Sequence, residues 1–195
     1  AIKVFGEVGV PSGFLEQIKK EFNHEVDTMA SVPPHQNILR LLAWSSSHLA
    51  IVTAMCERGS LYSILHGSDD LSWPVLLQMG LDACRGMQHL HSCKILHRDL
   101  KSANLLVDIT GGVRVADFGL SRVITRQNTM TGQMGTYQWM APEVLANQRY
   151  SEKADVYSMA IVLWETATRK IPYENMIGLQ AATAVLTRGL RPELA

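Results

Sequence analysis

His97-Arg98-Asp99-Leu100-Lys101-Ser102-Ala103-Asn104 is the stretch that decides the fold of this 195-residue chain. Asp117-Phe118-Gly119 and Ala141-Pro142-Glu143 follow it in order, and Ala1-Ile2-Lys3 stands at the start of the sequence. Each of these segments is short enough to arise by chance, but four of them in a fixed order are much more specific. The interpretation of the whole chain therefore rests on their order.

These four segments resemble the signature set of the eukaryotic protein kinase domain, and the resemblance runs over essentially the whole chain. It implies an α+β, two-lobed protein-kinase-like fold. The small lobe, of antiparallel strands and one helix, covers residues 1–56, and a mainly helical large lobe covers residues 57–195. The glycine-rich G-x-G-x-x-G loop of kinases does not precede Lys3 in the sequence. We therefore expect a partial kinase domain, truncated in the small lobe and without the C-terminal helices of the large lobe.

The resemblance implies that Asp99, Lys101 and Asn104 are the catalytic residues. Asp99 would accept or orient the proton of the acceptor hydroxyl, and Lys101 would offset charge on the transferring phosphate. Asn104 and Asp117 offer the oxygen ligands that Mg²⁺ prefers, with Mn²⁺ as an alternative. A competing interpretation makes Asp99 and Asn104 ordinary turn residues. That interpretation suits one such residue better than the whole ordered set.

The same resemblance implies an ATP site in which Lys3 contacts the α- and β-phosphates. Lys3 would also pair with a carboxylate on the following helix, and three glutamates compete for this role: Glu16, Glu21 and Glu25. We prefer Glu25, because Met29 follows it by four residues as the family arrangement requires.

The apolar strand that ends at Cys56 resembles the strand leading to the kinase hinge. Ala54 and Cys56 would then offer backbone groups to the adenine edge, and Thr53 would be the gatekeeper residue. The resemblance also places the adenine between Ala1 and Leu106.

Two structural roles follow from the resemblance as well. Four side chains are expected to stack into the hydrophobic column of active kinases: Met29, Leu41, His97 and Phe118. Asp155 resembles the buried aspartate that accepts backbone N–H groups from the catalytic loop, although it could simply stabilise a helix N-terminus.

The segment between Asp117 and Glu143 resembles the activation segment of kinases, and its residues 121–136 carry the candidate phosphorylation sites. Arg98 directly precedes the catalytic aspartate, and a guanidinium group there can form a bidentate pair with a phosphate. We predict that phosphate on Thr129 or Thr131 switches the enzyme on, added by an upstream kinase or by autophosphorylation. Thr136, in contrast, is expected to brace Asp99.

Lys101 and Gly135-Thr136 resemble serine/threonine kinases, so Ser and Thr hydroxyls of protein substrates are the expected acceptors. Trp139-Met140-Ala141-Pro142-Glu143 and Ile171-Pro172-Tyr173 resemble the tyrosine-kinase-like group of Raf-like and mixed-lineage kinases, which keeps dual specificity open. The alternative is a pseudokinase or an inactive fragment that acts as a binding module. Pseudokinases usually lose one of three residues that this chain has: Lys3, Asp99 and Asp117.

Apolar periodicity predicts a helix that Pro33-Pro34 ends, followed by a hairpin around Ser45-Ser46-Ser47. A long core helix should begin after Ser72, and a second should follow Ser151. The second is so apolar on all sides that we expect it to be buried all round. A further helix is expected over about 178–188.

Composition narrows the function classes. Lys plus Arg and Asp plus Glu both total 18, so no basic field argues for nucleic acid. Three cysteines without metal-ligand spacing favour reduced thiols and an intracellular, cytoplasmic location. The longest apolar run, Met159–Trp164, is too short to span a bilayer. Membrane attachment elsewhere in the parent protein stays open.

Overall fold

The structure is a computed structural model that describes residues 1–5, 12–117, 122–123 and 137–193. A small antiparallel sheet lies at one end, with the strand order β1-β3-β2. Its strands are β1 (Ile2–Val4), β2 (Leu41–Ser45) and β3 (Ala50–Thr53). Lys3 of β1 stands opposite Ile51 of β3, and the buried residues lie in this central strand while the two outer strands are largely exposed. β2 and β3 pair antiparallel with Ser45 opposite Ala50, so the predicted hairpin around Ser45-Ser46-Ser47 is confirmed.

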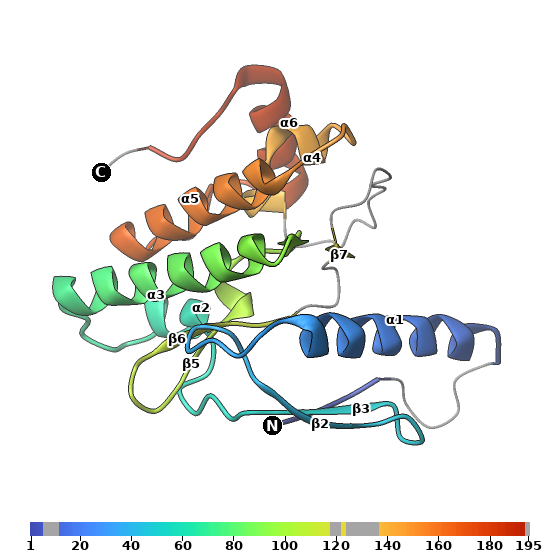
Figure 1. The fold of residues 1–195 in the computed structure, drawn as a ribbon. Coiled ribbons are helices and arrows are strands. Elements are labelled where there is room, and N and C mark those ends of the chain that lie inside the picture. The colour runs from blue at the N-terminus through green and yellow to red at the C-terminus, as the bar shows by residue number, and fades with distance from the viewer. Residues whose placement is uncertain (6–11, 118–121, 124–136, 194–195) are drawn as a thin grey trace.

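One helix, α1 (Ser12–Ser31), runs alongside this sheet (Figure 1). Phe22, Val26 and Met29 recur at helical spacing and are all buried, which explains why this stretch forms a helix with one apolar face. The helix ends shortly before Pro33-Pro34, because proline cannot continue it. Sheet and helix together form the small lobe.

The large lobe is built on α3 (Trp73–Ser92), which begins after the N-cap residue Ser72 with Pro74 in its first turn. The predicted apolar stripe is buried along its whole length: Leu76, Met79, Ala83, Met87 and Leu90. The other helical elements are α2 (Leu61–Leu65), the 3₁₀ turns η1 (Ser102–Asn104) and η2 (Tyr137–Trp139), α4 (Pro142–Leu145), α5 (Glu152–Thr168) and α6 (Gly178–Arg188). The short strands are β4 (Ile95–Leu96), β5 (Leu105–Val107), β6 (Val113–Val115) and β7 (Arg122–Val123); β4 pairs with β7 and β5 with β6.

Helix α5 packs beside α3 but is not buried all round (Figure 1). Met159 and Val162 are buried, whereas Val156 is 58% exposed and Leu163 is 38% exposed. The prediction of burial on every side is therefore wrong, because apolar composition fixes how hydrophobic a helix is and not how many neighbours cover it. Within the described ranges, none of the helices combines the length and apolar character needed to cross a membrane.

The loop after α1 attaches the small lobe to the large one. Its Asn37 accepts the N–H of Val115 at 2.9 Å and donates its side-chain amide to the carbonyl of Val113 at 3.0 Å. Gly86 of α3 permits this approach, since a Cβ atom there would lie 2.5 Å from the Asn37 carbonyl oxygen. The two lobes therefore meet through backbone contacts that sit directly behind the site.

Candidate active site

Asp99 is at the centre of the loop of residues 97–104, the predicted catalytic loop, and its two carboxylate oxygens have different surroundings. Lys101 Nζ lies 2.8 Å from Asp99 Oδ2, and Asn104 Nδ2 donates to the same oxygen at 3.0 Å and to the Asp99 carbonyl at 2.8 Å. Asp99 Oδ1 is buried and has no hydrogen-bond partner among the described residues. A buried acceptor of this kind is costly unless a partner arrives. The geometry thus leaves one carboxylate oxygen available to a hydroxyl.

The backbone of this loop is held by Asp155, at the start of α5. Its Oδ2 and Oδ1 accept the N–H groups of His97 and Arg98, each at 2.9 Å. Arg98 has a φ of 72°, a left-handed conformation that a non-glycine residue adopts at a cost. His91 of α3 makes the third contact of this carboxylate, with its Nε2 2.9 Å from Oδ2. The predicted contact of Asp155 with the loop is therefore present.

Two opposing effects act on the pKa of Asp155. Burial alone would raise it, but the hydrogen bonds from His91 and the two backbone N–H groups, with the nearby His97, outweigh burial and lower the pKa. Asp155 is thus an ionised, buried acceptor that stabilises the strained turn before Asp99.

His97 is fully buried, and its ring lies between the loop and the strand that leads to Asp117. Its Nε2 is 2.9 Å from the Ala116 carbonyl oxygen, and its Nδ1 accepts the Asp99 N–H at 3.3 Å. Met29 is buried in the main core, and Leu41 packs against that core. The fourth member of the predicted column, Phe118, lies outside the described residues.

On the nucleotide side, Lys3 and Glu25 are paired. Lys3 Nζ lies 2.8 and 2.7 Å from the two carboxylate oxygens of Glu25, and 3.6 Å from Asp117 Oδ1. Burial raises the pKa of Glu25, and this effect exceeds the opposing effect of Lys3. The structure therefore brings together the three charged residues that the sequence placed at the phosphates.

Asn104 and Asp117 suit a hard divalent cation. The Asn104 side-chain nitrogen is engaged by Asp99, which leaves its amide oxygen as the ligand atom. The Ala116 N–H donates to the Asn104 carbonyl at 2.9 Å and so keeps Asp117 beside this residue. The described part of the chain has no group of three or more His, Cys, Asp or Glu side chains that could hold a metal. Two oxygen ligands fit Mg²⁺, which keeps water and phosphate ligands, and do not fit a protein-enclosed zinc ion.

The expected adenine residues surround one small apolar cluster. Cys56 is buried with Leu39 and Ala116, and two of the predicted residues pack against them: Ala54 and Leu106. Thr53 donates its N–H to the Ala1 carbonyl at 2.9 Å, which sets Ala1 beside this strand. Burial raises the pKa of the Cys56 thiol, so this group is a neutral packing side chain.

Sequence reasoning missed a buried network around Glu165 of α5, as well as the role of His91. Glu165 is fully buried and bonds to Ser102 of the catalytic loop at 2.8 Å. The sequence did contain one indication of this network: Glu165 directly follows the apolar run Val162-Leu163-Trp164, and a carboxylate in such a setting is buried only when it is paired. The proposed phosphorylation sites Thr129 and Thr131, and the bracing residue Thr136, lie outside the described residues.

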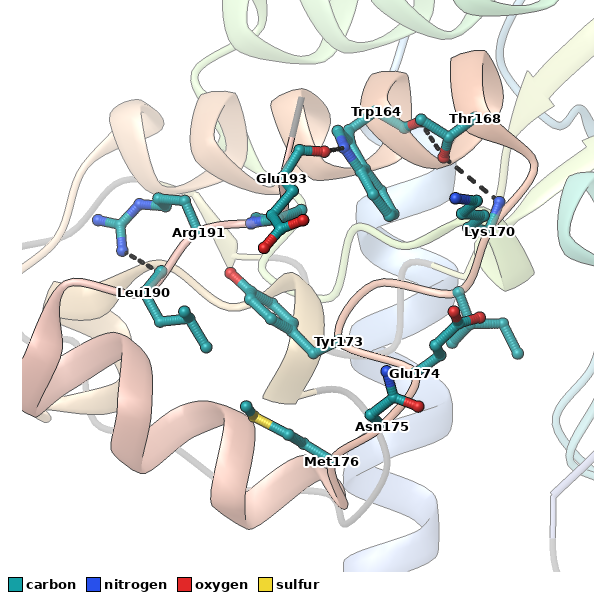
Figure 2. Close-up of a pocket in the computed structure, with 12 residues that line it drawn as sticks. Trp164, Thr168, Lys170, Tyr173, Glu174, Asn175, Met176, Leu190, Arg191 and Glu193 are labelled. Carbon is teal, nitrogen blue, oxygen red and sulfur yellow. Dashed lines mark hydrogen bonds between the residues drawn. The ribbon is translucent and has the colours of Figure 1, made fainter. Parts of the chain in front are cut away.

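A pocket of about 330 Å³ lies elsewhere, between the end of α5 and the chain after α6 (Figure 2). The Trp164 indole points toward the Glu193 carbonyl and donates to it at 2.7 Å. The lining residues are all at 164 or beyond, so none of the predicted catalytic, nucleotide or metal residues contributes. We do not assign the nucleotide to this pocket, because the charged residues that suit phosphate, Lys3 and its partners Glu25 and Asp117, lie where the two lobes meet.

A paired lysine, a catalytic-loop aspartate and an oxygen-ligand pair between two lobes define the catalytic domain of a protein kinase. The chain belongs to the protein tyrosine and serine/threonine kinase family, whose sequence profile matches residues 9–194. The resemblance on which the sequence interpretation rests, and the expected α+β kinase fold, are confirmed.

The chain is similar to several named kinases. It is 45% identical to serine/threonine-protein kinase STY46 of Arabidopsis thaliana over 94% of this chain and 32% of that protein. It is 47% identical to the probable serine/threonine-protein kinase drkA of Dictyostelium discoideum over 91% of this chain and 28% of that protein. It is 40% identical to the serine/threonine/tyrosine-protein kinase HT1 of Arabidopsis thaliana, over 91% of this chain and 46% of that protein. The chain thus spans between about a quarter and a half of these relatives.

Proposed function

We propose that the protein carrying this chain is an ATP-dependent protein serine/threonine kinase that transfers the γ-phosphate of ATP to Ser and Thr hydroxyls of protein substrates. The observation that carries the proposal is the Asp99 carboxylate, with Oδ2 held by Lys101 and Asn104 and Oδ1 left as a buried acceptor. The names of the relatives support serine/threonine specificity.

In this proposal, Asp99 Oδ1 accepts a hydrogen bond from the substrate hydroxyl and takes its proton as the oxygen attacks the γ-phosphorus of ATP. The bond from this phosphorus to the β,γ-bridging oxygen breaks, and ADP leaves with that oxygen. Lys101 faces the transferring group and offsets its negative charge. Mg²⁺ bound with ATP supplies further charge neutralisation, and Asn104 and Asp117 would hold that cation. Lys3, oriented by Glu25, would hold the α- and β-phosphates.

Adenine recognition and regulation complete the proposal. Ala54 and Cys56 would offer backbone groups to the adenine edge beside Thr53, and the ring would lie between Ala1 and Leu106. Protein substrates would dock on the large lobe, and phosphate on Thr129 or Thr131 would pair with Arg98. No described feature argues for a nucleic-acid partner.

Substitution of Asp99 by asparagine in the full-length protein tests the mechanism. Asparagine keeps the size of the side chain but cannot take a proton, so we expect turnover to fall by roughly 10² to 10⁴-fold. Transfer of labelled phosphate to protein substrate measures it. Asp69→Asn is the control, because Asp69 forms only an exposed pair with Arg58. Wild-type activity in Asp99→Asn would contradict the proposed role of Asp99. Absence of activity in the wild type as well as in the variant would favour the binding-module alternative.

A second candidate is dual specificity, which the printed name of HT1 favours. Phosphoamino acid analysis of the same labelled products separates the two. Phosphoserine and phosphothreonine alone support the proposal as stated, and phosphotyrosine in addition supports dual specificity.

A further inference from the structure

Glu165 has its carboxylate fully buried in the large lobe, where the proposed mechanism does not use it. A buried carboxylate is tolerated only when hydrogen-bond donors replace the water it has lost. Three donors do so. His66 Nε2 lies 2.9 Å and Ser102 Oγ 2.8 Å from Oε1, and the Trp139 indole N–H donates to Oε2 at 3.0 Å.

These donors come from three segments that are distant in sequence. They lie 99, 63 and 26 residues away from Glu165, in the order His66, Ser102 and Trp139. His66 ends α2, Ser102 begins η1, and Trp139 ends η2. One carboxylate on α5 therefore contacts three separate elements: α2, η1 and η2.

Two of these segments carry parts of the proposed reaction. Ser102 is fully buried and stands between Lys101 and Asn104, so its hydroxyl fixes the turn that presents both. Trp139 belongs to residues 137–143, which we call the platform segment because they end the stretch from Asp117 to Glu143 that we expect to receive the substrate peptide. The Trp139 carbonyl also accepts the Ser158 hydroxyl at 2.8 Å, so α5 holds this residue at two points.

We infer that Glu165 is a positioning residue that sets the catalytic loop and the platform segment in one relative geometry. The inference rests on the proposed kinase function. Ser102 transmits this geometry to the phosphate-facing residues, and Trp139 transmits it to the peptide side. Loss of the carboxylate then affects turnover and peptide binding together, whereas loss of either donor affects only one of them.

Three single variants separate these connections. Ser102→Ala removes the contact to the catalytic loop, and Trp139→Phe removes the contact to the platform segment. Glu165→Gln keeps the volume of the side chain but removes its negative charge, so each remaining hydrogen bond is weaker. If the N–H₂ group faces Trp139, the indole N–H also loses its acceptor. Thr166→Val is the matched control, since Thr166 is buried on the same helix and its hydroxyl bonds only within α5, to the Val162 carbonyl at 2.8 Å.

The measurement is kcat and KM of the full-length protein, per active enzyme, for ATP and for a serine peptide selected from an array by wild-type phosphorylation. We expect Ser102→Ala to lower kcat and Trp139→Phe to raise the peptide KM, each about tenfold, the size expected for one lost hydrogen bond to a charged group. Glu165→Gln should do both, with the KM for ATP unchanged. Thr166→Val should change neither constant.

A merely structural role gives a different result. If Glu165→Gln behaves as Thr166→Val, or only reduces the active fraction, the inference is overturned. Amide hydrogen exchange gives a readout that needs no activity: protection of residues 102–104 and 137–141 should fall together in Glu165→Gln and stay unchanged in Thr166→Val. If that pattern appears while the wild type phosphorylates no peptide, the positioning role stands and the proposed function fails.

Discussion

The two halves of the site differ in how their charges are held. On the nucleotide side, the side chains of Lys3 and Asp117 are 49% and 45% exposed. At the Asp99 loop, the side chains of Asp99 and of Asp155, which holds the loop from α5, are 5% and 4% exposed, and Asp155 accepts backbone N–H groups. Exposed charges are screened and cost little to rearrange, whereas buried charges are tied to fixed partners. The loop around Asp99 is therefore held by buried contacts, whereas the predicted nucleotide side combines one buried carboxylate, Glu25 at 5% exposure, with two charges that water reaches.

Among the substitutions that test this difference, Asp155→Asn should have the largest effect on stability. Asparagine can satisfy one of the two backbone N–H groups, so at least one buried donor loses its acceptor and the left-handed turn at Arg98 loses its support. We expect a loss of about 2 to 3 kcal/mol in stability, with faster amide exchange at His97 and Arg98. Urea unfolding and hydrogen exchange measure these effects.

Acid should remove the same contribution in the wild type. The pKa of Asp155 is lowered in the folded state, so its stabilisation is complete above the ordinary carboxyl range, near 4, and is lost as pH falls through the lowered value. Asp155→Asn should lack this part of the pH dependence. A variant with wild-type exchange at His97 and Arg98 would show that the loop is held by other contacts.

The contact between the lobes is tested by Gly86→Ala. The new Cβ would lie 2.5 Å from the Asn37 carbonyl oxygen and 2.6 Å from Val115 Cγ2, and the backbone of the Asn37 loop cannot give way freely. We expect a loss of roughly 1 to 3 kcal/mol from overpacking, measured by urea unfolding.

Gly80→Ala is the matched control on the same helix. Its Cβ would meet only Leu163 Cδ2, at 2.9 Å, and this side-chain end can move. Because alanine favours helix by about 1 kcal/mol over glycine, we expect little change or a gain in stability. Equal losses of unfolding free energy in the two variants would mean that the close contact between Gly86 and Asn37 does not contribute specifically to stability.

The smallest effect is expected at Glu25. Its pKa is raised in the folded state, mainly by burial, so its contribution to stability is present below the ordinary carboxyl pKa and is lost as pH rises through the raised value. This sign is opposite to that of Asp155. The stability of Glu25→Gln relative to wild type should rise as the pH increases above the ordinary carboxyl pKa, by about 1 kcal/mol or less, because Lys3 offsets part of the effect of burial. Unfolding across this range measures it, and a slope of the other sign would place Lys3 in control of Glu25.

Local sequence was sufficient for the elements whose cause is local. The stripe from Leu76 to Leu90 predicts α3, and the His97–Asn104 motif predicts the grouping of Asp99, Lys101 and Asn104 that the structure contains. It was not sufficient for burial that depends on distant partners. Val156 and Leu163 lie on the uncovered side of α5, and periodicity does not report what covers a helix. Glu165 likewise finds its donors 26 to 99 residues away, a distance over which no residue pattern reports contact.

The attachment at Asn37 also defines how the two lobes can move. The Leu39 N–H donates to the Val115 carbonyl at 2.9 Å, so this loop continues the β5–β6 pair as a third, noncovalent strand. The covalent crossing, residues 54–58, is a second point of attachment, and the Ala54 N–H joins it to the Arg40 carbonyl at 3.0 Å. The Asn37 loop is held further by Arg114, which donates to the Gln36 carbonyl at 2.7 Å, and by His89, whose Nε2 lies 2.9 Å from the Pro33 carbonyl oxygen. We therefore expect this loop to move with the large lobe, while Lys3 and Glu25 shift together through their ion pair.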